Sequence, residues 1–172
     1  MFSLEEASSR AEASTRLLAG QGGSEYRPQW PELSLRSGVV PFRVDADNCL
    51  EFLLIRRNGH PWWSLPKGRL TPGRTLADSA ALEAYEEAGI RGAIGSAPLG
   101  SYQYCKTDRR LLDPPRLVEL VLFSLKVEIE DDSWPERGIR QRRWFGQDHA
   151  PHFVAPGPLR ELLRDYNSHF LF

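Results

Sequence analysis

The stretch Leu65–Ile90, LPKGRLTPGRTLADSAALEAYEEAGI, decides the fold, because it joins a glycine-rich loop to a helix that carries three carboxylates near its end. Thr75 followed three residues later by Asp78 forms a capping box, and Gly89 supplies a left-handed stop. We therefore expect a helix over about 76–88.

This helix would carry its negative charge at the wrong end. Glu83, Glu86 and Glu87 lie three and four residues apart and near the C-terminus, where each clash costs about 0.3 to 1 kcal/mol. The helix has no Lys or Arg at a compensating spacing, so we expect a partner from outside it. Hard oxygen ligands of this kind suit Mg²⁺ or Mn²⁺, although a solvated acidic face would give the same pattern.

The loop before the helix favours the metal site. Its glycines permit tight turns and close approach to a ligand, and Lys67 adds a mobile cation. Together, loop and helix resemble the signature of the Nudix hydrolases. The positions that match its spacing are Gly68, Glu83, Glu86, Glu87, Gly89 and Ile90.

Two positions depart from that signature. Arg74 stands where the family has a glutamate, and Leu82 stands where it has the arginine before Glu83. In the family those two residues mainly support and orient the loop and the helix. Because an acid and a base are lost together, no unpaired buried charge need remain. We therefore expect metal binding to survive in this variant.

The resemblance implies hydrolysis of a diphosphate linkage with Mg²⁺, or Mn²⁺, as the cofactor. Glu83, Glu86 and Glu87 are the expected catalytic and metal-binding residues, and the carbonyl of Gly68 is an expected additional ligand. Glu83 and Glu87 would ligate the metal, while Glu86 would be a further ligand or would activate water. Bridging by the metal would neutralise the pyrophosphate oxygens.

The substrate is expected to be a polyphosphorylated small molecule. Its predicted contacts are Arg56, Arg57, Lys67, Arg140 and Arg142. The spacing of 64–68, with Arg56 and Arg57 upstream, looks like the group that cleaves diphosphoinositol polyphosphates and diadenosine polyphosphates. The pair at 62–63, both tryptophan, would stack a base or lie in the core. A nucleotide sugar or a nucleoside triphosphate is therefore the alternative substrate.

A Nudix-fold binding or regulatory module is the alternative from another class. In that interpretation Arg74 and Leu82 would mark lost catalysis. The three helix glutamates argue against it, because a module that only binds has no need of a destabilising acidic cluster.

Composition limits the remaining classes. The 172 residues, 41% of them hydrophobic, supply one buried core, and a net charge of −1 provides no polycation for stable nucleic-acid binding. Cys49 and Cys105 form no CxxC pair, and no apolar run is long enough to cross a bilayer. We expect a cytoplasmic protein that does not bind membranes, with a homodimer as an open alternative.

The predicted architecture is the Nudix α/β/α sandwich with a mixed sheet, over residues 35–168. Residues 1–34 are expected to be an appendage with some helix. An Asn58-Gly59 pair predicts a type I′ hairpin. Strands are expected over 37–44, 50–57, 62–65, 91–97, 99–106 and 117–129, with a final strand at Trp144-Phe145 and a last helix over 158–167. Glu119 would face the core and need a partner.

Overall fold

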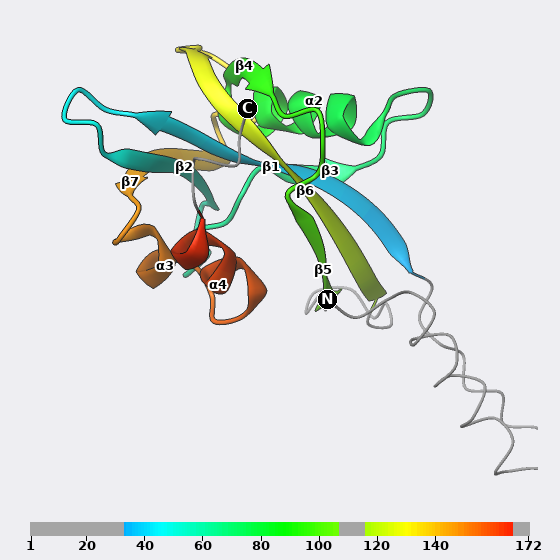
Figure 1. Cartoon of the computed structure of the whole chain (residues 1–172). Helices are drawn as coiled ribbons and strands as arrows, with labels where there is room; N and C mark the ends of the chain where they lie inside the picture. The colour runs from blue at the N-terminus through cyan, green and yellow to red at the C-terminus, as the bar shows by residue number, and fades with distance from the viewer. Residues whose placement is uncertain (1–32, 107–115, 167–172) are drawn as a thin grey trace, which may run out of the picture. The chain divides into compact units, whose positions relative to one another are not determined.

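The computed structural model describes residues 33–106 and 116–166, and in them one mixed sheet carries helices on both faces (Figure 1). The predicted appendage at 1–34 lies almost entirely outside the described residues. The elements are β1 (Ser34–Val44), β2 (Leu50–Arg57), β3 (Lys67–Arg69), α2 (Leu76–Ala88), β4 (Ile90–Ile94), β5 (Gly100–Lys106), β6 (Arg116–Glu130), β7 (Arg140–Gly146), α3 (Ala150–Phe153) and α4 (Pro158–Asp165).

The sheet has the strand order β4-β6-β1-β2-β7, with β3 paired to β1 and β5 paired to β6. β1 and β6 run parallel, whereas the other strand pairs run antiparallel. The prediction of a mixed sheet is therefore confirmed. β2 and β3 both pair with β1. Residues 67–69, expected to be a loop, therefore form a short strand of the same sheet.

Each face of the sheet has its own hydrophobic core. α2 covers one face with its small residues, Ala80, Ala84 and Ala88, all fully buried. α3 and α4 cover the other face, where Val154 and Leu163 are fully buried (Figure 1). Alanine lets the α2 backbone lie close to the strands, which brings the glutamates at its margin close to β3 and β7.

The boundaries of α2 match the sequence prediction. The Thr75 hydroxyl oxygen accepts a hydrogen bond from the Asp78 N–H at 3.1 Å and donates to the Asp78 carboxylate at 2.7 Å. At the other end Gly89 has φ 63°, and its N–H donates to the Tyr85 carbonyl at 2.8 Å. Both ends of the helix are thus fixed by local chemistry that the sequence already specifies.

The segment before β3 was predicted wrongly. Instead of a strand over 62–65, Trp63 and Ser64 form only isolated bridges, to Val154 and Ile55. Gly59 has φ 78° but Asn58 does not have a positive φ, so the turn is not type I′. The chain uses its backbone hydrogen bonds here to tie α3 to β2, which the local sequence does not reveal. The four-residue α3 was also missed, because it is too short for a periodic signal.

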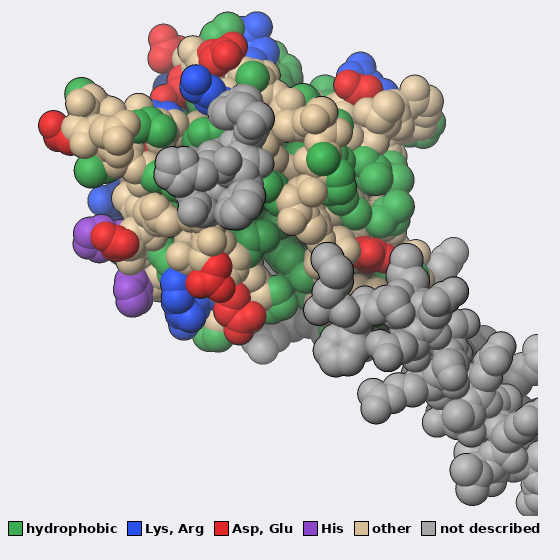
Figure 2. Space-filling model, in the orientation of Figure 1, with side chains coloured by type: hydrophobic (Ala, Val, Ile, Leu, Met, Phe, Trp, Pro, Cys, Tyr) green, Lys and Arg blue, Asp and Glu red, His purple; other side chains and the backbone are tan. Residues whose placement is uncertain are grey.

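Acidic and basic side chains are interspersed over the face of the molecule seen in Figure 2, in keeping with the net charge of −1. No helix in the described residues is long and apolar enough to cross a membrane. Cys49 and Cys105 are both free and exposed.

The N-cap of α2 provides a direct test of how much local chemistry holds the helix. We expect Thr75→Ala to lower the free energy of unfolding by about 1 kcal/mol, because one N-terminal N–H loses its acceptor. Thr75→Ser keeps the hydroxyl and is the matched control. Denaturant unfolding measures both variants, and equal stability of the two would contradict the proposed role of the cap.

Candidate active site

Glu83 and Gly68 meet where α2 lies against β3. Gly68 is the middle residue of β3 and points towards the helix, opposite Ser37 of β1. A Cβ atom built on Gly68 would overlap the carboxylate of Glu83, so a side chain at this position would displace that carboxylate. The predicted pairing of the loop glycine with the first helix glutamate is therefore a direct contact.

Glu87 is the most buried of the three glutamates, with 5% of its surface exposed. Its Oε2 accepts a hydrogen bond from the backbone N–H of Lys67 at 2.9 Å, and its Oε1 forms an ion pair with the Arg140 guanidinium. The Nε of Arg140 donates in turn to the carboxylate of Glu136. One carboxylate of α2 is thus bound to β3 and to β7.

The carboxylates of this site repel one another in a partly dry environment. The pKa of Glu83 is raised to about 7, first by burial and then by the charges of Glu87, Glu86 and Glu136, against the opposing charge of Arg140. Burial also raises the pKa of Glu87, which the hydrogen bond from Lys67 and the charge of Arg140 oppose. Burial lowers the pKa of Lys67 to about 8 despite the nearby charge of Glu87.

Arg142 provides the positive charge that the end of α2 lacks. Its Nη1 donates to the carbonyls of Ala88 and Gly89, at 2.6 Å and 3.2 Å. Its guanidinium lies 4.3 Å from the centre of the Trp134 ring. The compensation expected from outside the helix is therefore supplied at least in part by two arginines of β7. The predicted contact of Arg142 with substrate stays a prediction.

The sheet separates the two predicted arginines of β2. Arg56 donates to the Gln141 side chain at 2.8 Å and lies 4.8 Å from the centre of the Trp63 ring, on the α3–α4 face. Arg57 is exposed and lies opposite Arg140 in the register, on the α2 face. Alternation along a strand therefore places only Arg57 on the side of the glutamates. Trp63 is buried in the core, which is one of the two positions that the sequence predicted for the tryptophan pair.

Two residues near the site, Glu136 and Arg36, carry little or no sequence signal. Glu136 forms an ion pair with Arg140, and the only sign of this pair in the sequence is the four-residue spacing between them. Arg36 on β1 lies near Lys67, and its Nε is buried without a hydrogen-bond partner in the described part of the chain. Glu119, which the sequence predicted to need a partner, is half-buried and accepts a hydrogen bond from the Ser101 hydroxyl at 3.1 Å.

The departures from the family signature lie at the surface of the loop and helix. Arg74 is exposed, and its N–H closes a turn by donating to the Thr71 carbonyl at 3.1 Å. Leu82 is half-buried. The ion-pair partner of Glu87 is Arg140 of β7, and neither Arg74 nor Leu82 takes part in that pair.

The donors of the site suit a hard divalent cation in their chemistry. Carboxylates from successive turns of α2 lie beside the backbone of Gly68, and their mutual repulsion favours a bound cation. Within 33–106 and 116–166, however, no three side chains of Asp, Glu, His or Cys converge as a ready ligand group. Arg140 occupies one oxygen of Glu87, so a metal at this position would share or replace that ion pair.

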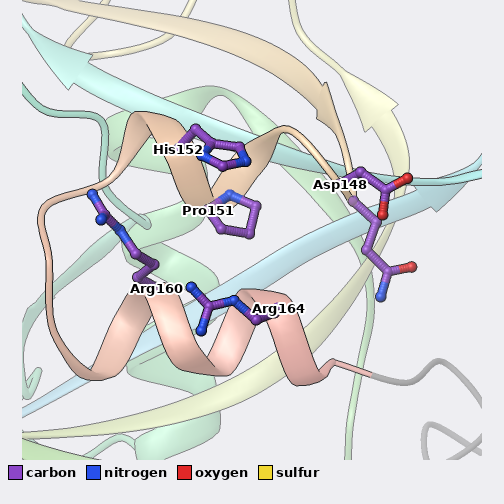
Figure 3. A pocket seen from close by; sticks show the side chains of 6 residues that line it. Asp148, Pro151, His152, Arg160 and Arg164 are labelled. Atoms are coloured by element: carbon purple, nitrogen blue, oxygen red, sulfur yellow. The ribbon is translucent and has the colours of Figure 1, made fainter.

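A separate pocket of about 220 Å³ lies between α3 and α4 (Figure 3). Its lining residues are Gln147, Asp148, Pro151, His152, Arg160 and Arg164. Gln147 directly follows the Gly146 end of β7, whereas Arg140 begins that strand. The strand length of about 20 Å separates this pocket from the glutamates.

The family model of the NUDIX domain matches residues 34–166. The chain belongs to the Nudix family. It is 30% identical over 142 residues to Nudix hydrolase 12, mitochondrial, of Arabidopsis thaliana, covering 75% of this chain and 70% of that protein. It is 42% identical over 124 residues to a Bacillus subtilis (strain 168) protein provisionally named an 8-oxo-dGTP diphosphatase. That match covers 70% of this chain and 74% of the Bacillus protein. The family membership confirms the prediction of a pyrophosphohydrolase.

Solved structures confirm the fold. A C. elegans Ap4A hydrolase binary complex superposes with a TM-score of 0.57 at 23% identity, covering 80% of this chain and 97% of that one. The Nudix domain of Shewanella oneidensis NrtR, complexed with ADP ribose, superposes with a TM-score of 0.59 at 18% identity, covering 81% and 90%. The predicted Nudix α/β fold is therefore correct.

Removing Arg140 tests the ion pair with Glu87. The side chains of the pair are 20% and 7% exposed, so we expect Arg140→Met to destabilise the protein by about 3 kcal/mol through an uncompensated buried carboxylate. Adding Glu87→Gln to that variant removes the charge and should recover part of the loss. Urea unfolding without metal measures both, and an additive effect of the two changes would contradict the ion pair.

The raised pKa of Glu83 predicts a specific pH dependence. Between the ordinary pKa of 4.5 and about 7 the unfolded chain loses the proton while the folded chain keeps it, so the stability due to this group falls as pH rises through this range. Glu83→Gln lacks that fall. We expect the melting temperature of the variant, relative to wild type, to increase from pH 5 to pH 8 in EDTA. A constant difference across this range would show that the shift is absent.

Proposed function

We propose that the protein hydrolyses a diphosphate linkage in a nucleoside- or inositol-polyphosphate substrate, with Mg²⁺ or Mn²⁺ as cofactor. The observation that carries this proposal is the contact of Glu83 and Glu87 with the 67–68 loop, which gathers carboxylates and a backbone segment at one place. The family supplies the reaction class, and these contacts support the proposed residues.

Glu83, Glu87 and the Gly68 carbonyl are the groups that would hold the cation. When bound, the metal would neutralise phosphate oxygens and lower the pKa of attacking water. Glu86 is half-buried and, in the described part of the chain, its carboxylate makes no hydrogen bond or ion pair. It is therefore the glutamate most available to accept a proton from water, or to serve as a further ligand.

Two cations adjoin these carboxylates. The Lys67 Nζ donates to the Ser64 hydroxyl at 2.5 Å and to the Leu65 carbonyl at 3.2 Å, which holds the ammonium beside the loop. Arg140 faces the same glutamates from β7. We propose that both contact substrate phosphates, together with Arg57, while Arg56 and Arg142 are engaged by Gln141 and by the end of α2.

The alternative is a nucleotide-binding module without turnover. The observation that favours it is the Arg140 guanidinium on Glu87, which competes with a metal for one carboxylate oxygen. The NrtR Nudix domain in complex with ADP ribose has the same fold. A nucleoside triphosphate or nucleotide sugar is the alternative substrate of the enzyme. A cytoplasmic location and a homodimer stay predictions, and the Arabidopsis relative is named as mitochondrial.

A substrate panel tests the proposed function. Product release is measured from diadenosine polyphosphates, diphosphoinositol phosphates, nucleoside triphosphates and nucleotide sugars, each with Mg²⁺ and with Mn²⁺. We expect metal-dependent turnover that falls by at least about a hundredfold in Glu87→Gln, because a neutral amide is a poor ligand for a hard cation.

Glu161→Gln is the matched control, since this glutamate is exposed on α4 on the other side of the sheet. Its activity should equal that of wild type. Tight binding of a panel compound with no turnover at either metal would favour the binding module, and full activity of Glu87→Gln would reject the assigned site.

A further inference from the structure

Two arginines lie directly opposite each other at the N-terminal end of β1. In the antiparallel register of β1 and β3, Arg36 is the partner of Arg69. Like charges at directly opposed positions destabilise a strand pair. Arg69 is exposed and Arg36 is half-buried, and neither forms an ion pair with any described residue. Within 33–106 and 116–166, these two guanidinium groups therefore lie opposite each other without an ion-pair partner.

Lys67 adds a third positive charge to the same face of the sheet. Lys67 pairs with Gly38, and a Cβ atom on Gly38 would lie 2.7 Å from the Lys67 Cβ, so Lys67 and Arg36 share a face by strand alternation. The charge of Arg36 is close enough to lower the pKa of Lys67. This concentration of cations is typical of a site for a multiply charged anion.

Two tyrosines of β5 flank this group. Tyr102 and Tyr104 lie opposite Leu120 and Val118 of β6, and Leu120 is also the β6 partner of Arg36. Their ring centroids are 6.1 Å apart, and both side chains are half-buried. Burial raises the pKa of Tyr104, and the nearby charge of Arg36 opposes that shift. The cations therefore have an amphipathic wall beside them.

We propose that Arg36 and Arg69 form a subsite for a phosphate group of the substrate that is not part of the cleaved linkage. This inference rests on the proposed function. Gly68 points to Glu83 on the α2 face, while Arg36 and Arg69 point to the opposite face. Lys67 connects the two, because its N–H binds Glu87 and its side chain lies with Arg36.

The subsite selects among the substrate classes. A linkage at Glu83 and Glu87 uses two phosphates, so a group bound by Arg36 and Arg69 is at least a third. Dinucleoside polyphosphates, nucleoside triphosphates and diphosphoinositol polyphosphates carry such a group, whereas a nucleotide sugar carries only the two phosphates of its linkage. The paired guanidinium groups would bind the third phosphate through charge-assisted hydrogen bonds.

Kinetics on two substrates test the subsite. We expect Arg36→Met and Arg69→Met each to raise KM for diadenosine tetraphosphate by about tenfold or more with little change in kcat, since one charged hydrogen-bond partner is lost. Neither variant should change the kinetics of any ADP-ribose hydrolysis. Arg164→Met, an exposed arginine on α4, is the matched control and should behave as wild type.

A binding measurement without turnover separates the subsite from the proposed function. Inorganic tripolyphosphate in EDTA should raise the melting temperature of wild type and of Arg164→Met, and should do so much less in the Arg36 and Arg69 variants. If no substrate is turned over but this difference is seen, the hydrolase fails and the subsite stands. Equal KM values and equal responses to tripolyphosphate in all variants would overturn the subsite and leave the hydrolase intact. Because Arg69 is exposed, Arg69→Met keeps the test valid should Arg36→Met fold poorly.

Discussion

The buried ion pair between Glu87 and Arg140 is the interaction on which the arrangement of the site depends. A carboxylate that is 5% exposed is costly to bury unless its charge is paired and hydrogen-bonded. Arg140 supplies the charge from β7, and the Lys67 N–H supplies a hydrogen bond from β3. The Glu87 carboxylate therefore links α2 to β3 and to β7, and Glu136 holds the Arg140 guanidinium in place.

The sheet distributes the cations of the chain between two faces. Arg140 and Arg142 act on the α2 face, where they neutralise Glu87 and the carbonyls at the end of the helix. Arg36 and Arg56 lie on the opposite face, beside Tyr104 and Trp63. Lys67 binds Glu87 through its N–H and lies near Arg36, so β3 is the place where a long polyanionic substrate of the proposed kind would meet the glutamates and the cations of both faces.

The parts of the site that were predictable are those with local causes. The capping box at Thr75 and the left-handed Gly89 act within a few residues, so the bounds of α2 follow from the sequence. The spacing of Gly68 and Glu83 likewise identified a pair that is in direct contact. The strand over 62–65 was wrong because the hydrogen bonds of Trp63 and Ser64 go to α3 and β2, and these partners are distant in sequence.

By itself the sequence determined the mixed α/β fold, the helix that carries the three glutamates, and the need for positive charge near the end of that helix. Only the tertiary structure decided that Arg140 and Arg142 meet this need and that Arg36 lies opposite Arg69. The physical reason is range. Helix caps and periodic patterns depend on neighbours along the chain, whereas strand register sets which charges face each other, and register depends on the packing of the whole sheet.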